Sequence, residues 1–207
     1  MHHIPNLLTV LRLILSLAMF FALVAIGFGL SGAGAGPQDG VWLARFAFGA
    51  LVVAAVTDFF DGWLARRWKA VSLVGAILDP IADKILVCGA ILGLLAVQAP
   101  GVLIPGALIL FRELAVSAMR EVLAPRGIKL PVTLLAKIKT TLQLVALAAI
   151  MFVWFWPVWS LSARADHLRI ALQGAQILWS VAAVVTLWTG IEYARAAWKA
   201  LRAQFAG

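Results

Sequence analysis

The chain has 207 residues, of which 64% are hydrophobic and only 13% are charged, and its mean hydropathy is +1.02. Soluble domains contain about 45–50% apolar and about 25% charged residues, so this composition excludes a soluble globular enzyme and favours a polytopic membrane protein. It also excludes a disordered chain, because disorder goes with low hydrophobicity. The net charge is +8. In a membrane protein, excess Lys and Arg usually lies in cytoplasmic loops near anionic lipid headgroups, so we expect membrane lipids and not nucleic acid as partners.

Six stretches of the chain are candidates for membrane-spanning helices, which need about 20 mostly apolar residues. In chain order they cover residues 7–30, 41–64, 72–97, 102–123, 132–156 and 168–196. We expect the Gly-rich residues 31–40 to form a flexible turn and not a phosphate-binding loop, because no strand precedes them and no Lys-Ser/Thr pair follows. The sequence therefore predicts an all-α bundle of about six transmembrane helices, in a single domain over residues 1–207.

The distribution of positive charge predicts the orientation of these helices. Lys and Arg gather after the second, fourth and sixth stretches, at Arg66, Arg67, Lys69, Arg126, Lys129, Arg195, Lys199 and Arg202. The connections on the opposite side carry almost no charge. Because positive charge marks the cytoplasmic side, we expect both termini in the cytoplasm and residues 31–40 outside.

Four carboxylates lie where membrane proteins rarely keep charge. An ionisable group at a helix centre costs about 2.5–3.5 kcal/mol on insertion scales. Asp58 and Asp61 are three residues apart at the cytoplasmic end of the second stretch, and Asp79 and Asp83 are four apart in the early turns of the third. Each pair therefore lies on one helix face. A short connection makes the two helices antiparallel neighbours, so the four carboxylates can converge.

Converging carboxylates repel one another and recruit cations. Oxygen ligands select a hard divalent ion such as Mg²⁺, Mn²⁺ or Ca²⁺. Four carboxylates can hold two ions about 3.5–4 Å apart, the arrangement used for displacement at phosphorus. The alternative is that these are helix-end carboxylates, which face headgroups or pair with Arg66 and Lys84.

Small residues and one arginine accompany the carboxylates. Gly62 directly follows Asp61, and Ala65 and Gly75 each lie about one turn from an aspartate. A missing or short side chain lets a ligand or a neighbouring backbone approach closely. Arg66 adds a planar cation that suits a phosphate.

These residues form one pattern, Asp58-x-x-Asp61-Gly62-x-x-Ala65-Arg66, eight residues, Gly75-x-x-x-Asp79-x-x-x-Asp83. The chain thereby resembles the CDP-alcohol phosphotransferase family, whose signature it matches at every defining position. Within that family, residues 4–12, 78–84, 111–121 and 137–143 resemble the bacterial members that use glycerol 3-phosphate as the acceptor. The last third of the chain resembles the family only in hydropathy.

The resemblance implies a six-helix enzyme, homodimeric, in the bacterial inner membrane, with its active site open to the cytoplasm. Such an enzyme transfers the phosphatidyl group of CDP-diacylglycerol to sn-glycerol 3-phosphate and releases CMP. The resemblance implies that two ions of Mg²⁺ or Mn²⁺ are bound by Asp58, Asp61, Asp79 and Asp83. It also implies that Asp83 is the general base. It gives contacts with CDP-diacylglycerol to Asn6, Thr9, Gly62, Ala65, Arg66 and Gly75. For Asn6 and Thr9 the alternative is simple capping of the first helix.

A second cluster, in or near the fourth and fifth stretches, has more cations than acids. Its cations are Arg112, Arg120, Lys137 and Lys139. Arg112 and Arg120 are eight residues apart, about two turns, and so share a helix face. This surplus suits a small phosphorylated acceptor, either glycerol 3-phosphate or inositol phosphate. The alternative is that Glu113 and Glu121 pair with these cations.

Two other functions remain open at this point. A sister phosphotransferase would use inositol phosphate, serine or phosphatidylglycerol, although the basic surplus argues against an acceptor without phosphate. A divalent-metal transporter would also hold carboxylates in the membrane, but near the midplane and beside broken helices. The carboxylates here cluster at the cytoplasmic end, which favours the transferase.

Overall fold

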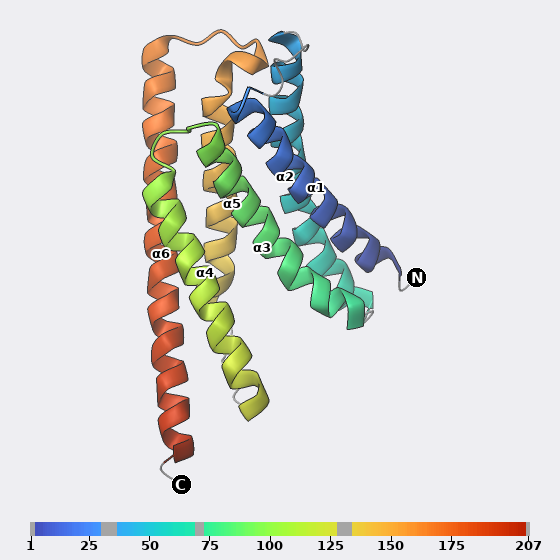
Figure 1. Ribbon diagram of the computed structural model, residues 1–207, viewed down its shortest axis with the longest axis vertical. Coiled ribbons are helices and arrows are strands. Elements are labelled where there is room, and N and C mark those ends of the chain that lie inside the picture. The colour runs from blue at the N-terminus through green and yellow to red at the C-terminus, as the bar shows by residue number, and fades with distance from the viewer. Residues whose placement is uncertain (1–2, 30–36, 69–72, 128–133, 206–207) are drawn as a thin grey trace. The chain divides into compact units, whose positions relative to one another are not determined.

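A computed structural model describes residues 3–29, 37–68, 73–127 and 134–205. Its helices are α1 (His3–Gly27), α2 (Pro37–Trp68), α3 (Leu73–Ala96), α4 (Leu103–Leu123), α5 (Leu134–Trp154) and α6 (Ala165–Phe205), with the short 3-10 helices η2 (Ala124–Arg126) and η3 (Trp156–Trp159) (Figure 1). The described residues contain no strand. The predicted all-α chain of about six long helices is therefore confirmed.

Several helix boundaries differ from the prediction, most clearly in α2 and α6. Residues 37–40, which we expected in the turn, form the first turn of α2. Pro37 suits this position because its missing N–H would have no helical partner there, and Asp39 is favoured by the positive end of the helix dipole. α6 extends beyond the predicted residues 168–196 at both ends. The glycines of the expected turn, within residues 31–36, lie outside the described residues.

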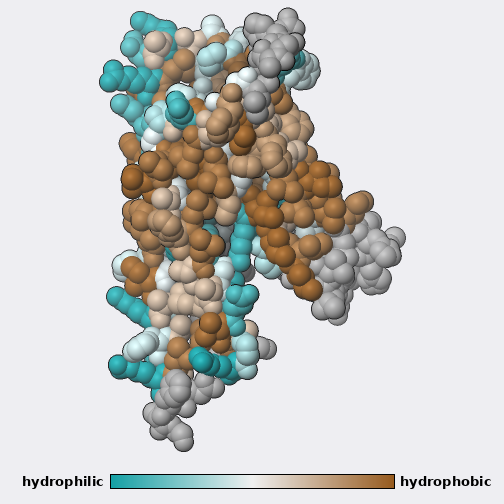
Figure 2. Space-filling model, in the orientation of Figure 1, coloured by the Kyte–Doolittle hydropathy of each residue, from teal (hydrophilic) through white to brown (hydrophobic). Residues whose placement is uncertain are grey.

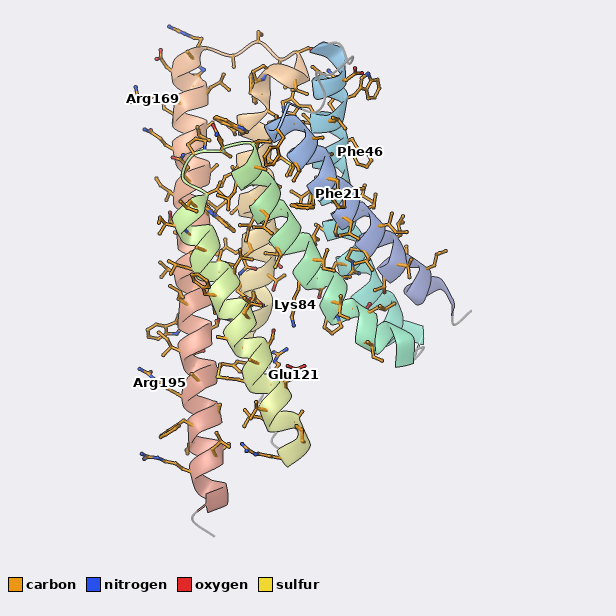
Figure 3. All side chains as sticks on the ribbon, in the orientation of Figure 1. Phe21, Phe46, Lys84, Glu121, Arg169 and Arg195 are labelled. Atoms are coloured by element: carbon orange, nitrogen blue, oxygen red, sulfur yellow. The ribbon has the colours of Figure 1, made fainter. Side chains whose placement is uncertain are left out.

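The helices have the apolar surface of a membrane protein. Within the described residues, three segments are long and apolar enough to cross a membrane, namely Leu7–Gly27, Asp39–Asp58 and Ala165–Arg202, and α5 holds a shorter one, Ile138–Trp154. α3 and α4 fall short because they carry the charged residues of the two predicted clusters. Large apolar side chains remain exposed, among them Phe21 of α1 and Phe46 of α2 (Figure 3). The visible face of α1 and α3 is correspondingly apolar (Figure 2).

The described chain forms two compact units. The first comprises Met1–Pro100 and Leu147–Ala175, and the second comprises Gly101–Ala146 and Gln176–Gly207. In the second unit, Ile109 and Val116 of α4 and Trp179 of α6 are buried, and the indole Nε1 of Trp179 donates a hydrogen bond to the carbonyl oxygen of Val102 at 3.3 Å. That the whole chain is a single domain stays a prediction.

In the first unit, α1 and α3 run in the same direction and approach each other closely (Figure 1). Gly89 and Gly93 are four residues apart on α3, and a Cβ atom at Gly93 would lie 2.5 Å from Cδ1 and 2.9 Å from Cβ of Leu23 on α1. A Cβ atom at Gly27 would clash with the carbonyl oxygen of Ala96. Small residues in this spacing allow such contact between helices in a membrane.

The face of α1 that is buried in this packing changes character along the helix. It consists of residues three and four apart, all at most 2% exposed: Thr9, Arg12, Ser16, Met19 and Leu23. Such spacing marks one stripe of an α-helix. Its C-terminal part is apolar and packs on α3, whereas its N-terminal part is polar. Helix packing therefore fixes where Thr9 and Arg12 lie.

Candidate active site

Arg12 joins two of the predicted site carboxylates. Its Nη1 atom lies 2.7 Å from Oδ1 of Asp58 on α2 and 2.7 Å from Oδ1 of Asp83 on α3. The Arg12 side chain is 1% exposed, whereas those of Asp58 and Asp83 are 37% and 42% exposed. The structure thus brings together one carboxylate from each predicted pair, on a buried cation, with part of each carboxylate open to a ligand.

A third carboxylate is bound by the same helix. The Thr9 hydroxyl donates a hydrogen bond of 2.5 Å to Oδ1 of Asp79, and Thr9 is 2% exposed. Ser16, one turn after Arg12, donates to the Arg12 carbonyl oxygen at 2.7 Å. Because α1 begins at His3, Thr9 is inside the helix, and the capping alternative is wrong for this residue. α1 therefore supplies a hydroxyl and a guanidinium to three aspartates.

For several predicted site residues, the structure describes the helical backbone but not the side chain. The backbones of Asn6, Asp61, Gly62, Ala65, Arg66 and Lys137 are helical, in α1, α2 or α5. Gly75 is buried in the first turn of α3. Lys84, one of the two partners in the alternative interpretation, is exposed, and the ion pairs seen for Asp58 and Asp83 are with Arg12. The roles predicted for these residues stay predictions.

The described donors suit a hard metal ion. Among described side chains, no group of three or more acidic, His or Cys residues is close enough to hold an ion; the side chain of the fourth aspartate, Asp61, lies outside the described part of the structure. Asp58 and Asp83 already converge on a cation, the guanidinium of Arg12. Carboxylate oxygens are the ligands that Mg²⁺ and Mn²⁺ prefer. The donor set therefore fits a divalent ion of this class.

The sequence analysis missed Arg12 as a site residue, although a signal was present. Arg12 is the only charged residue between positions 4 and 38. An ionisable residue within a membrane-spanning helix indicates a functional site, and its partner has to be sought among opposite charges. The aspartates of the next two helices were the available partners.

The second cluster is organised around Arg112 of α4, which is 8% exposed. Its Nε atom donates to the Thr186 carbonyl oxygen at 3.2 Å, and its Nη2 atom donates to the Thr189 hydroxyl at 3.1 Å. Its Nη1 atom lies 2.9 Å from Oε1 of Glu113. α6 therefore fixes the guanidinium of Arg112 from one side, and its own helix neighbour fixes it from another.

Glu113 also binds Lys139 of α5, which is 6% exposed, through the same Oε1 atom. The alternative that Glu113 pairs with the cations therefore holds for Arg112 and Lys139. Because the single carboxylate of Glu113 pairs with both Arg112 and Lys139, these three residues together keep an excess positive charge. Glu121 is exposed.

Arg120 contacts Tyr193 of α6, one helical turn after Thr189, which Arg112 contacts. Its Nε and Nη2 atoms donate to the Tyr193 hydroxyl at 3.2 and 2.9 Å, and its guanidinium carbon lies 5.1 Å from the centre of the Tyr193 ring. Arg112 and Arg120 contact α6 residues that are four apart, so the predicted shared face is confirmed. The sequence analysis missed the α6 partners. Their signal was the spacing of Thr186, Thr189 and Tyr193, which are three and four residues apart on one helix.

Several known proteins are similar to this chain in sequence. The sequence profile of the CDP-alcohol phosphatidyltransferase family matches residues 2–189. A Cereibacter sphaeroides protein is 43% identical over 174 residues, which cover 83% of this chain and 69% of the relative. Proteins of Shigella flexneri and Escherichia coli K12 are 39% identical over 198 residues, 94% of each chain. All three are named CDP-diacylglycerol–glycerol-3-phosphate 3-phosphatidyltransferase. Since the profile spans nearly the whole sequence, this chain belongs to the CDP-alcohol phosphatidyltransferase family.

Proposed function

We propose that this protein transfers the phosphatidyl group of CDP-diacylglycerol to sn-glycerol 3-phosphate, giving phosphatidylglycerophosphate and CMP. The acceptor hydroxyl oxygen forms a bond to the phosphorus that carries the diacylglycerol, and the bond from that phosphorus to the CMP oxygen breaks. The names of relatives that match 83–94% of the chain support this reaction. The observation that carries it is the convergence of Asp58 and Asp83 on Arg12.

Four carboxylates would hold the metal in this proposal: Asp58, Asp61, Asp79 and Asp83. Family members generally depend on a divalent metal, and we propose two ions of Mg²⁺ or Mn²⁺. When bound, the ions would neutralise charge on the pyrophosphate and on the departing CMP. Thr9 holds Asp79 by its hydrogen bond, and Arg12 holds Asp58 and Asp83 at one point.

Asp83 takes the proton of the acceptor hydroxyl as general base. Its side chain is 42% exposed while its Oδ1 atom is held by Arg12, so the carboxylate is both fixed and reachable. The nucleotide and phosphates of CDP-diacylglycerol bind to Asn6, Thr9, Gly62, Ala65, Arg66 and Gly75. Of these, Thr9 is buried and donates a hydrogen bond to Asp79, and Gly75 is buried about one turn before Asp79 on α3.

The acceptor phosphate binds to the basic group of Arg112, Arg120, Lys137 and Lys139. Arg112 and Lys139 share the single carboxylate of Glu113, so the group retains positive charge for a phosphate. Arg112 uses three of its five N–H groups on described partners. Guanidinium groups bind phosphate oxygens in pairs, which suits the remaining N–H groups.

The setting of the enzyme follows the same proposal. The chain is a multi-pass protein of the bacterial inner membrane, with both carboxylate pairs on the cytoplasmic side. It acts as a single domain over residues 1–207 and as a homodimer. Its second candidate acceptor is inositol phosphate, which the same basic group would bind.

The test is CMP release by the purified chain in lipid nanodiscs, supplied with CDP-diacylglycerol and Mg²⁺ or Mn²⁺. The acceptors are glycerol 3-phosphate, inositol phosphate, serine, phosphatidylglycerol and glycerol, each with and without EDTA. We expect metal-dependent release with glycerol 3-phosphate at the highest kcat/KM. A higher kcat/KM for inositol phosphate or for an acceptor without phosphate would overturn the proposed acceptor, and release that EDTA leaves unchanged would overturn the proposed metal site.

A further inference from the structure

One face of α6 lines the two arginines of α4. Thr186, Thr189 and Tyr193 are three and four residues apart, which places them on the same stripe of the helix. All three are at most 6% exposed. Arg195, two residues after Tyr193, instead projects from the exposed side of α6 (Figure 3). The buried face of α6 thus carries hydroxyl groups that contact Arg112 and Arg120.

The Thr189 hydroxyl has a fixed direction. It donates to the Thr186 carbonyl oxygen at 2.8 Å, so its lone pairs accept from Nη2 of Arg112 at 3.1 Å. The Thr186 hydroxyl is fixed in turn, because it donates to the Ala182 carbonyl oxygen at 2.6 Å and accepts from Nε2 of Gln143 at 2.7 Å. The hydroxyl protons of Thr186 and Thr189 both have backbone acceptors. The Thr189 hydroxyl therefore presents only its lone pairs to Arg112, and this orients the guanidinium.

Gly190 provides the space in which the Arg112 side chain lies. A Cβ atom at this position would be 2.8 Å from Cγ and 3.4 Å from Nε of Arg112. Cγ is close to the α4 backbone, so it cannot swing away as the end of a side chain can. An alanine at position 190 would therefore displace the stem of Arg112.

Tyr193 holds the second arginine in two ways. Its hydroxyl accepts from Nε and Nη2 of Arg120, and its ring lies below the same guanidinium at 5.1 Å. Tyr193 is buried whereas Arg120 is exposed. The tyrosine therefore anchors one edge of the guanidinium and leaves the other edge to a ligand.

We propose that Thr189 and Tyr193 are positioning residues for the acceptor phosphate: Thr189 orients Arg112, in space that Gly190 keeps open, and Tyr193 orients Arg120. This inference rests on the proposed function and adds α6 to its acceptor site. Long arginine side chains lose rotamer freedom when they bind a ligand, and side chains already held in place lose less. The α6 residues act through the arginines and do not touch the reacting atoms.

The experiment measures KM for both substrates in four variants of the full chain. Thr189→Val and Tyr193→Phe each remove a hydroxyl at nearly constant shape, and Gly190→Ala displaces Arg112. Each should raise KM for glycerol 3-phosphate roughly 3- to 10-fold, as expected for loss of one hydrogen bond, and leave KM for CDP-diacylglycerol unchanged. Thr189→Ser keeps the hydroxyl and should restore wild-type KM.

The matched control is Gly174→Ala, on the same helix, where an added Cβ atom meets nothing within 4 Å. It should leave both KM values at wild type. If Gly190→Ala does not fold, Thr189→Val and Tyr193→Phe still decide the question. Unchanged KM for glycerol 3-phosphate in both would overturn the inference, as would an equal rise in both KM values with a lower Tm.

A second readout separates this inference from the proposed reaction. Inorganic phosphate at increasing concentration should raise the Tm of the wild-type protein, and Thr189→Val and Tyr193→Phe should need more phosphate for the same rise. That result without CMP release would overturn the proposed function and support the phosphate site. CMP release together with the same phosphate-dependent rise of Tm in all variants would support the proposed function and overturn the inference about Thr189 and Tyr193.

Discussion

Arg12 of α1 and Asp83 of α3 are 71 residues apart in the sequence, and Nη1 of the arginine lies 2.7 Å from Oδ1 of the aspartate. The same nitrogen lies 2.7 Å from Oδ1 of Asp58 on α2. One guanidinium therefore ties three helices together at the proposed catalytic carboxylates. This contact makes α1 a part of the site and not only a membrane anchor.

Arg12→Gln should impair both catalysis and stability, because Asp58 and Asp83 would repel each other without their shared cation. We expect kcat/KM to fall at least about 10-fold, the effect of losing a hydrogen bond to a charged group, and Tm to fall with it. Arg45→Gln is the control, since Arg45 is exposed and donates to the Val158 carbonyl oxygen. Wild-type kinetics in Arg12→Gln would show that Arg12 plays no part in the site.

Asp61→Asn and Asp83→Asn should separate metal binding from proton transfer. Asp61→Asn removes a charged ligand from a hard-cation site, so metal affinity and activity should be lost together. Asp83→Asn should lose about 10²–10⁴-fold in rate, the usual contribution of a general base, and keep more of its metal affinity. Calorimetric titration with Mn²⁺ measures the affinity. Equal loss of affinity in both variants would make Asp83 chiefly a ligand.

Arg112→Lys should raise KM for glycerol 3-phosphate although the charge is kept. Lys cannot reproduce the fork that donates to Thr186, Thr189 and Glu113 together. We expect roughly a 10-fold rise or more, the effect of a charged hydrogen bond. Arg169→Lys, an exposed position on α6 (Figure 3), is the matched control. A KM that does not move would make Arg112 a structural partner of Glu113.

Gly93→Ala should destabilise the packing of α1 on α3. The new methyl group would lie 2.5 Å from Leu23 Cδ1, and overpacking of this kind costs about 1–3 kcal/mol. Gly49→Ala on α2 is the matched control, since its Cβ atom meets nothing within 4 Å and alanine is the better helix former. Thermal unfolding in one detergent compares the two. A Tm for Gly93→Ala equal to that of Gly49→Ala would contradict the packing described here.

Single cysteines should report the predicted orientation, once Cys88 is replaced by alanine. A cysteine at Asp39 should react with a membrane-impermeant maleimide added to intact cells. A cysteine at Arg126 should react only after the membrane is permeabilised. The reverse pattern would mean that the positive-inside rule fails for this chain and that the carboxylates face outward.

The helices could be predicted from the sequence because each combines an apolar run with clear interruptions. The start of α2 could not be placed, because Pro37 and Asp39 are typical of turns and equally of a helix start. The spacing of the aspartates indicated one face per pair, and Asp58 and Asp83 do meet a common partner. Arg12 and the α6 hydroxyl groups stand out locally as polar residues in apolar helices, but their partners lie 71 to 77 residues away, and no local pattern identifies those partners.

The most direct measurement follows carbon-13-labelled glycerol 3-phosphate into lipid by mass spectrometry, alongside CMP release. The protein is the purified chain in nanodiscs with CDP-diacylglycerol and Mg²⁺. The account predicts labelled phosphatidylglycerophosphate in equal amount to CMP, from the wild-type protein and not from Asp83→Asn. CMP release without labelled lipid would show hydrolysis of CDP-diacylglycerol instead of transfer, and would contradict the account.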